Sequence, residues 1–231
     1  MCGVYGAPMP AQMVPYSPTR LDPAAQLERG VAFYEEMMQR RSVRSFSDEP
    51  VPRDLVELAI NTASTAPSGA HKQPWTYVLT GDSEIKAQIR QAAEEEERIN
   101  YEGGRLPPHW REDLEPLGTD WRKPFLVPAP WVVVLFEQRY GVREDGSRAH
   151  HYYVKESVGI SAGLFIAALH HMGLVTLTHT PSPMRFLTEL LGRPKSERPF
   201  CLFPIGYPAE DCVVPDLSRK GLDQVMVTVG T

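Results

Sequence analysis

The pattern of apolar and polar positions predicts a chain in which helices and strands alternate. Leu27, Val31, Tyr34 and Met38 recur at steps of four, three and four residues, the spacing of one face of a helix over 22–38. Cap residues and runs rich in β-branched side chains delimit the other elements. The other expected helices are 51–62, 82–101, 152–172 and 183–191, and the expected strands are 75–80, 130–136, 174–178 and 200–205. Because these elements interleave without a linker, the pattern predicts one α+β domain.

Three regions fall outside this pattern. Residues 1–22 are Pro-rich and lack periodicity, which predicts a flexible N-terminal arm. Residues 102–125 form a polar stretch too long for a simple connector, and such stretches are usually lids or binding segments. Residues 207–231 are interpreted as an extended C-terminal arm, which leaves 23–206 as the folded domain. Within that domain, residues 139–150 (RYGVREDGSRAH) are interpreted as a surface loop.

The helix expected over 152–172 is apolar on nearly every side, which is typical of a helix buried on most of its faces. Gly159, Gly163 and Ala167 follow at steps of four and leave a groove that another backbone can approach closely. Two explanations stay open, a central core helix and a helix at a subunit interface. The same helix matches G-x-S-x-G at Ser161, but a nucleophile elbow needs a strand directly before its serine. Ser161 is therefore interpreted as a packing residue.

Composition then limits the classes of function. Of 231 residues, 42% are hydrophobic and 23% are charged, which is ordinary for a folded protein. The net charge, 24 − 29 = −5, argues against a nucleic-acid partner of the basic-patch kind. Three scattered cysteines favour a reducing compartment, so a cytoplasmic location is expected. The most apolar stretch is shorter than the roughly 20 residues that span a bilayer, so no membrane is expected. No spacing of histidines and cysteines predicts a metal site.

The first segment with candidate chemistry is cationic. Arg40-Arg41-Ser42-Val43-Arg44 places three guanidiniums and a hydroxyl in five residues. Each guanidinium can bind two oxygens of a phosphate at once, so this turn is a candidate phosphate site. A solvated, charged helix end would explain the same residues. A further cationic pair, Arg219-Lys220, lies in the C-terminal arm.

Two further segments are a small-residue loop and an acidic helix end. Residues 66–71 (APSGAH) would let a ligand approach the backbone closely, although an ordinary helix-to-strand turn has a similar composition. Four glutamates, 94–97, stand near the end of a helix, where acidic side chains oppose the macrodipole. Glu97 and Tyr101 are four residues apart and lie on one face. Acidic residues at a helix end where the macrodipole disfavours them often have a functional role. A solvated acidic face is the alternative explanation of these glutamates.

In this order the segments resemble the flavin-dependent nitroreductase superfamily, and specifically its deiodinase branch. The similarity runs from about Met38 to Val229 through RRSVRSFSDEPVP, TAPSGAHKQPW, EEEERINY, LVTLTHTP, LLGRP and GYPAEDCVVPDLSRKGLDQVMVTV. It implies a central mixed sheet flanked by helices and an intertwined homodimer whose C-terminal arms exchange. It also implies two FMN molecules at the subunit interface. The membrane anchor of the animal members is not carried over to this chain.

The resemblance also implies roles for single residues. The FMN-binding residues would be Arg40, Arg41, Ser42, Val43, Arg44, Ser68, Thr178, His179, Thr180 and Arg219. The Thr180 hydroxyl would bond flavin N5, which makes Thr180 the catalytic residue. Glu97, Tyr101 and Lys123 would bind the zwitterion of an amino-acid substrate, and the Ala70 amide would bind its phenolate oxygen. A carboxylate for an ammonium, and donors for a carboxylate, make chemical sense of that set.

The implied reaction is reductive removal of halide from mono- and diiodotyrosine. Reduced FMN would supply the electrons in single steps, and an external donor or NADPH-linked reductase would restore it. The lid, 102–125, carries Lys123 and is expected to order over the substrate. The main alternative is a generic NAD(P)H-dependent nitroreductase or flavin reductase, which has no use for the Glu97, Tyr101 and Lys123 set. A flavin-storage protein without turnover is the alternative from another class.

Overall fold

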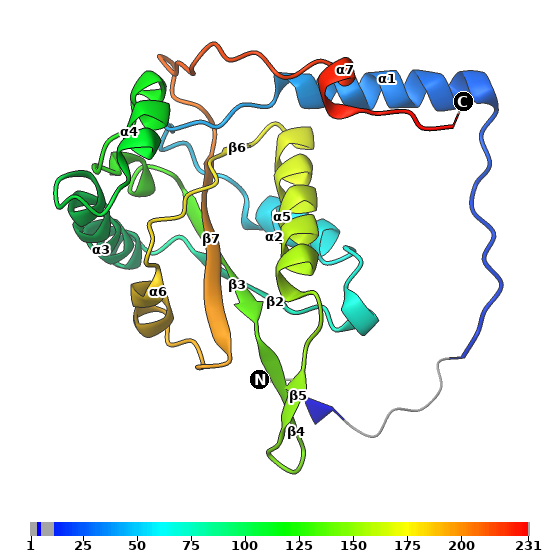
Figure 1. Ribbon diagram of the computed structural model, residues 1–231, viewed down its shortest axis with the longest axis horizontal. Helices are drawn as coiled ribbons and strands as arrows, with labels where there is room; N and C mark the ends of the chain where they lie inside the picture. Colours follow the sequence, from blue (N-terminus) through cyan, green and yellow to red (C-terminus); the bar gives the residue numbers. More distant parts are fainter. Residues whose placement is uncertain (1–3, 6–11, 231) are drawn as a thin grey trace.

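The computed structural model describes residues 4–5 and 12–230, and it places helices on both faces of a central sheet (Figure 1). The sheet order is β2-β3-β7-β6, and every pair of these strands is antiparallel. The strands are β2 (Trp75–Thr80), β3 (Trp131–Gln138), β6 (Val175–Thr176) and β7 (Glu197–Gly206). A parallel bridge between Ser42 and Thr176 adds the cationic turn to the sheet edge. The expected mixed sheet is therefore antiparallel apart from this bridge.

Strand β3 contributes to two separate cores, because successive side chains of a strand point to opposite faces. Val133 and Leu135 pack with α2 (Arg53–Ala63) and α5 (Val154–His171). Val132, Val134 and Phe136 pack on the other face, against α3 (Ser83–Tyr101), η3 (Pro124–Leu126) and α6 (Arg185–Leu190). Burial on both faces explains why β3 is a continuous apolar run without alternation.

Local capping sets the ends of the main helices. The Asp22 carboxylate accepts hydrogen bonds from the backbone N–H groups of the first turn of α1 (Pro23–Gln39). Asp82 caps α3 in the same way, as expected for an N-cap carboxylate. Helix α5 ends before Gly173, whose φ of +75° is a left-handed conformation that favours glycine.

The structure corrects the interpretation of residues 139–150. They form a hairpin of β4 (Tyr140–Arg143) and β5 (Arg148–His150), so the expectation of an unstructured surface loop was wrong. The connecting turn contains Asp145-Gly146, and Gly146 has a φ of +79°. An Asp-Gly pair between two short strands is a hairpin signal that the loop interpretation overlooked.

Described segments near both ends of the chain lie against other elements. β1 (Val4–Tyr5) pairs in parallel with β4, and residues 12–22 form no helix or strand. The rest of the expected N-terminal arm lies outside the described residues. Residues 207–230 run back beside α1 and include α7 (Leu222–Val225) (Figure 1).

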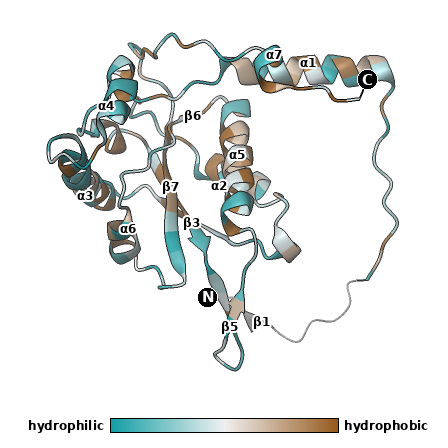
Figure 2. Cartoon of the chain, in the orientation of Figure 1, coloured by the Kyte–Doolittle hydropathy of each residue, from teal (hydrophilic) through white to brown (hydrophobic). Residues whose placement is uncertain are grey.

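Helix α1 carries the predicted apolar stripe but buries none of its residues. Leu27 is 70% exposed and Tyr34 is 63% exposed. In Figure 2 most of α1 projects beyond α5, with the arm that carries α7 beside it, and the C-terminal part of α1 bonds α5 through Glu36 and His170. Apolar residues of the adjoining C-terminal arm are also exposed, among them Leu217, Leu222 and Val225. Apolar surface of this extent is typical of a protein-protein contact. In the chain as described, no helix is long and apolar enough to cross a membrane.

Candidate active site

The cationic turn and the C-terminal arm line one groove of about 310 Å³. The Arg219 guanidinium donates hydrogen bonds to the carbonyl oxygens of Met38 (3.0 Å) and Arg40 (2.7 Å), which lie 181 and 179 residues away in the chain. Arg41 also donates to the Met38 carbonyl, at 2.8 Å. The structure thus brings together two cationic segments from opposite ends of the chain, and Leu117 of the lid adds to the groove wall.

This groove carries uncompensated positive charge. Over residues 12–230, none of Arg40, Arg41, Arg44 and Arg219 forms an ion pair with a carboxylate. Burial lowers the pKa of Arg40, and the charges of Arg219 and Arg41 lower it further. Burial also lowers the pKa of Arg44. Guanidiniums crowded together without a counterion are stabilised by a bound anion, so the residues present fit a phosphate group.

Hydrogen bonding to the sheet edge orients the cationic turn. The Val43 N–H donates to the Thr176 carbonyl at 3.1 Å, and the Val43 side chain is buried in the core. Ser42 and Arg44, on either side of Val43, both line the groove. Alternation along an extended segment explains this division, because neighbouring side chains point to opposite sides. Any cofactor contact of Val43 therefore falls to its main chain.

A second cavity, of about 280 Å³, adjoins the groove at Arg44, which lines both. Helix α3 contributes Glu97 and Tyr101, the lid contributes Lys123, and residues 178–180 form another wall. The lid folds into α4 (Pro108–Leu114) and η2 (Glu115–Leu117). Its residues on the cavity are Leu106, Trp110, Leu114, Thr119, Lys123 and Phe125. The structure thus brings Glu97, Tyr101 and Lys123 together under the lid.

The ammonium of Lys123 and the carboxylate of Glu97 form a buried ion pair, with Nζ and Oε2 3.5 Å apart. Lys123 is 4% exposed and Glu97 is 9% exposed. Burial raises the pKa of Glu97 and lowers that of Lys123, and in each case the charge of the partner opposes the shift. The Lys123 ammonium also lies 5.5 Å from the ring centre of Tyr101 and donates to the Asp120 carbonyl. A carboxylate, an ammonium and a phenol are therefore gathered within one cavity.

Residues 178–180 all line the cavity but differ in exposure. Thr178 and Thr180 are exposed, whereas His179 between them is buried. The His179 N–H and carbonyl pair with Leu202 at 2.9 and 2.8 Å. Its ring packs edge-on against Phe125, with centroids 5.6 Å apart. Burial lowers the pKa of His179 to about 3, and the charges of Lys123 and Arg44 act in the same direction. His179 is thus a neutral, buried ring between two threonines that are exposed at the cavity.

The small-residue loop lies elsewhere in the same chain. Its short helix η1 (Gly69–His71) is strained, since Ala70 and His71 have φ values of 48° and 51°. The Gly69 N–H donates to Ser157 of α5 at 3.4 Å, which ties the loop to that helix. Ser68 and Ala70 line neither the cationic groove nor the cavity at Glu97. In Figure 1 this loop stands beyond α5, on the side away from α3 and α4.

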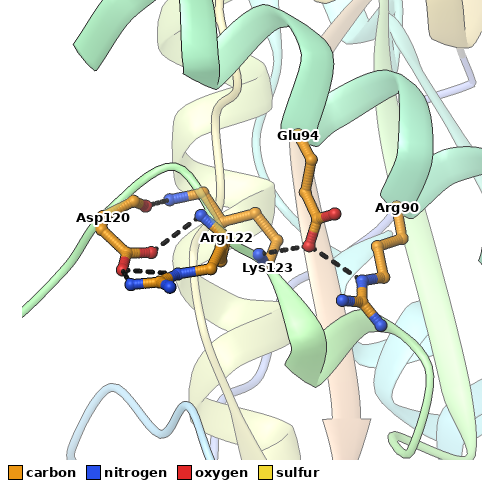
Figure 3. Close-up of polar contacts among 5 residues, drawn as sticks. All are labelled: Arg90, Glu94, Asp120, Arg122 and Lys123. Atoms are coloured by element: carbon orange, nitrogen blue, oxygen red, sulfur yellow. Dashed lines mark hydrogen bonds and ion pairs between the residues drawn. The ribbon is translucent and has the colours of Figure 1, made fainter. Parts of the chain in front are cut away.

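Glu94, one of the four glutamates at the end of α3, has contacts that its place in this acidic run did not indicate. One oxygen of its carboxylate accepts hydrogen bonds from the Lys123 N–H, at 2.7 Å, and from Arg90 Nε, at 2.8 Å (Figure 3). The spacing of Arg90 and Glu94, four residues apart on a helix, was a signal for the second contact. The long-range contact with Lys123 had no signal in the sequence.

Ser161 has the packing role that the sequence analysis assigned to it. Its hydroxyl donates to the Ala63 carbonyl at 3.0 Å and bonds the Tyr77 hydroxyl at 2.8 Å. The residue is fully buried within α5. The G-x-S-x-G match is therefore part of a helix contact and does not form a nucleophile elbow.

The chain is similar to known proteins over most of its length. Residues 37–207 match the nitroreductase family. An iodotyrosine deiodinase from Haliscomenobacter hydrossis is 53% identical, over 93% of this chain and 96% of that protein. Iodotyrosine deiodinase 1 from Homo sapiens is 45% identical, over 94% of this chain and 75% of that protein. A crystal structure of oxidized iodotyrosine deiodinase bound to FMN and 3-iodo-L-tyrosine is 29% identical, with a TM-score of 0.75 over 86% of this chain and 99% of that one. The chain therefore belongs to the nitroreductase family, and within it to the iodotyrosine deiodinases.

Proposed function

We propose that this protein removes halide reductively from halogenated tyrosines, with FMN as its cofactor. The observation that carries the proposal is the buried Glu97–Lys123 pair, with Tyr101 beside it, next to a groove whose arginines have no carboxylate partner in the described residues. The first provides for a zwitterion and the second for a phosphate. A related enzyme binds FMN and 3-iodo-L-tyrosine together, and these are ligands of those two kinds.

The cationic groove suits the phosphate of FMN. Arg40, Arg41, Arg44 and Arg219 would bind its oxygens, and the Ser42 hydroxyl would add a further hydrogen bond. When bound and reduced, FMN supplies the electrons that cleave the carbon–halogen bond. Thr180 is exposed beside the adjoining cavity, where its hydroxyl would donate to N5 of the flavin ring. Thr178 would offer a second hydroxyl on the same face.

The cavity suits the amino-acid group of a halotyrosine. Glu97 would accept hydrogen bonds from the substrate ammonium, and Lys123 and Tyr101 would donate to its carboxylate. Before substrate binds, the opposite charges of Glu97 and Lys123 pair with each other, so neither is buried alone. The lid covers this cavity and would keep water away from the bound zwitterion, which strengthens each ionic contact.

A homodimer would complete this site. Ser68 and Ala70 lie away from the cavity of their own chain, so the second subunit would supply them, and the Ala70 amide would bind the phenolate oxygen. The exposed stripe of α1 and the C-terminal arm offer apolar surface for that contact. On α5, Ile160 is 47% exposed, and the space around Gly159 and Gly163 is open. One face of α5 packs in the core and the other would face the partner.

The source of electrons and the location of the protein are proposed from the resemblance. An NADPH-linked reductase or another external donor would reduce the flavin, and the protein would act in the cytoplasm. A generic nitroreductase would share the cofactor and the dimer. It would leave the buried Glu97–Lys123 pair without a role.

Anaerobic single-turnover measurement tests the proposal. Protein loaded with FMN and reduced with dithionite is mixed with diiodotyrosine, and flavin oxidation and free iodide are followed together. We expect one iodide for each flavin oxidised in the first turnover. Rapid oxidation by a nitroaromatic compound, with no iodide released from diiodotyrosine, would instead identify a generic nitroreductase. Flavin that neither substrate oxidises would identify a storage protein.

A further inference from the structure

We propose that Glu94 is a positioning residue that places Lys123 for binding the substrate carboxylate. The inference rests on the proposed function of the cavity. It assigns to Glu94 no contact with substrate or flavin, since Glu94 lines neither the cationic groove nor the substrate cavity. Glu94 would instead make the site selective for halophenols that carry a free carboxylate.

Glu94 accepts a hydrogen bond from the main chain of the lid. The Lys123 N–H donates to Glu94 Oε1 at 2.7 Å. The next residue, Pro124, has no N–H, so the Lys123 amide is the last donor that the lid offers before η3 begins. Arg90 donates to the same oxygen and holds the carboxylate in place (Figure 3). A bond between an N–H and an ionised carboxylate is stronger than one between neutral groups.

The chain directly after Lys123 is fixed to α3 and to the core. Lys86 of α3 donates to the carbonyls of Val127 (3.0 Å) and Ala129 (2.8 Å). The side chains of Phe125 and Leu126 are buried. Upstream, the Arg122 guanidinium bonds Asp120 two residues away and is exposed. Earlier in the lid, Arg105 pairs with Glu96 of α3 and Arg111 donates to the Tyr101 carbonyl. Glu94 therefore holds the lid at its other end, where the chain returns to the body of the protein.

Two glutamates on one face of α3 contact different parts of Lys123. Glu94 and Glu97 are three residues apart, so both side chains reach the same side of α3. Glu94 holds the main chain of Lys123, and Glu97 pairs with its ammonium. Because Arg90 already pairs with Glu94, the Lys123 ammonium is left for Glu97 and, on binding, for the substrate carboxylate. Loss of the contact between Glu94 and the Lys123 N–H would therefore move the Lys123 ammonium away from Glu97.

The experiment compares two ligands on variants of Glu94. Dissociation constants for 3-iodotyrosine and its methyl ester are measured from quenching of flavin fluorescence in the oxidised, FMN-loaded protein. The ester keeps the ammonium and the halogenated ring but lacks the carboxylate that Lys123 would bind. In Glu94→Ala we expect binding of 3-iodotyrosine to weaken about tenfold, the effect of losing one charged hydrogen bond. Binding of the ester is expected to stay within twofold.

Two more variants separate the effect of side-chain length at position 94 from the effect of its charge. Glu94→Asp keeps the charge but is one methylene too short, so it should show the same selective loss even if Glu94→Ala does not fold. Glu94→Gln keeps the length and an acceptor oxygen, so it should recover most of the affinity. The control is Glu95→Ala, an exposed neighbour whose carboxylate accepts from Gln91.

The outcomes keep this inference apart from the proposed function. Equal weakening of both ligands, or unchanged binding of 3-iodotyrosine in Glu94→Ala and Glu94→Asp, would overturn the positioning role. If the wild-type protein binds FMN but neither ligand, the proposed function of the cavity fails and the positioning role fails with it. Selective weakening of the free amino acid, with recovery in Glu94→Gln, would support the inference.

Discussion

Lys123 Nζ lies 3.5 Å from Glu97 Oε2, and this buried ion pair joins the lid to helix α3 at the cavity. A buried pair of this kind adds little to stability, because removing both charges from water costs about as much as their attraction returns. Its value is instead chemical. The pair presents one charge of each sign at the place where a zwitterion would bind.

Replacing Glu97 by Gln should weaken binding of 3-iodotyrosine by about tenfold or more, since the substrate ammonium loses its charged acceptor. FMN should stay bound, because Glu97 does not line the cationic groove. Titration of the oxidised protein measures both properties through flavin fluorescence. Glu95→Gln, in the same acidic run but exposed, is the matched control. Wild-type affinity in Glu97→Gln would remove Glu97 from the binding set.

Replacing Arg219 by Gln should reduce FMN affinity more than replacing its neighbour Lys220. Arg219 is held in the groove by the carbonyls of Met38 and Arg40, whereas Lys220 does not line it. Loss of one charged contact corresponds to about tenfold weaker binding, and the difference should shrink in high salt. Equilibrium dialysis of the apoprotein against FMN at two salt concentrations measures it. Equal losses in the two variants would show that only general charge attracts the cofactor.

The sequence predicted most of the fold because local signals and tertiary packing agree there. Trp75–Thr80 and Ser83–Tyr101 are the elements expected from β-rich composition and from the Asp82 cap. The hairpin at Asp145-Gly146 also had a local signal, and it was overlooked. The expected strand 174–178 is shorter as β6. Beyond β6 the chain stays beside β7 through the pairing of His179 with Leu202, which no local pattern specifies.

Site prediction met a different limit. Proximity of Arg219 to Arg40 depends on how the C-terminal arm returns over the domain, and the contact spans 179 residues. The resemblance supplied this pairing, and spacing alone could not. The same holds for the contact of Glu94 with Lys123, which needs the path of the lid. The separation of Ser68 and Ala70 from the cavity also follows only from tertiary structure.

Replacing Thr180 by Ala should slow iodide release from diiodotyrosine, because the flavin ring would lose its hydroxyl donor at N5. Reduction of a nitroaromatic compound by the same reduced protein should change much less, since hydride transfer does not need that donor. Thr180→Ser keeps the hydroxyl and should restore the rate. Stopped-flow measurement of flavin oxidation with each substrate gives the comparison. Equal slowing with both substrates would instead indicate a general change in flavin binding.

Complementation between two impaired variants, assayed at a substrate concentration well below saturation, should test whether the site is shared by two chains. Gly69→Val disturbs the small-residue loop, since a Cβ at this position would lie 2.7 Å from the Tyr152 carbonyl oxygen. Glu97→Gln disturbs the cavity. If loop and cavity come from different subunits, a mixed dimer has one site with both defects and one intact site.

Co-expression with two affinity tags isolates that mixed dimer, and iodide release should return to about half the wild-type rate. Each variant purified alone is the control. If the mixed dimer releases iodide no faster than either variant alone, the loop and the cavity belong to the same chain. A protein that sediments as a monomer would exclude a shared site.

Below neutral pH, His179 should make the protein less stable. The pKa of this buried ring is about 3, and in the unfolded chain it returns to about 6.5. Between these values the unfolded state binds the extra proton, so the free energy of unfolding falls as the pH falls, by about 1 kcal/mol for each pH unit below 6.5.

In His179→Leu that pH-dependent contribution disappears. Since the Nε2 atom of the ring has no hydrogen-bond partner in the described structure, the replacement should cost little stability at pH 7.5. Urea unfolding at pH 7.5 and 5.5 measures how much the free energy of unfolding changes in the wild type and in His179→Leu. His109→Leu, at an exposed position on α4, is the control. An unchanged dependence on pH in His179→Leu would mean that the ring is protonated inside the folded protein, which would also require an anion beside it.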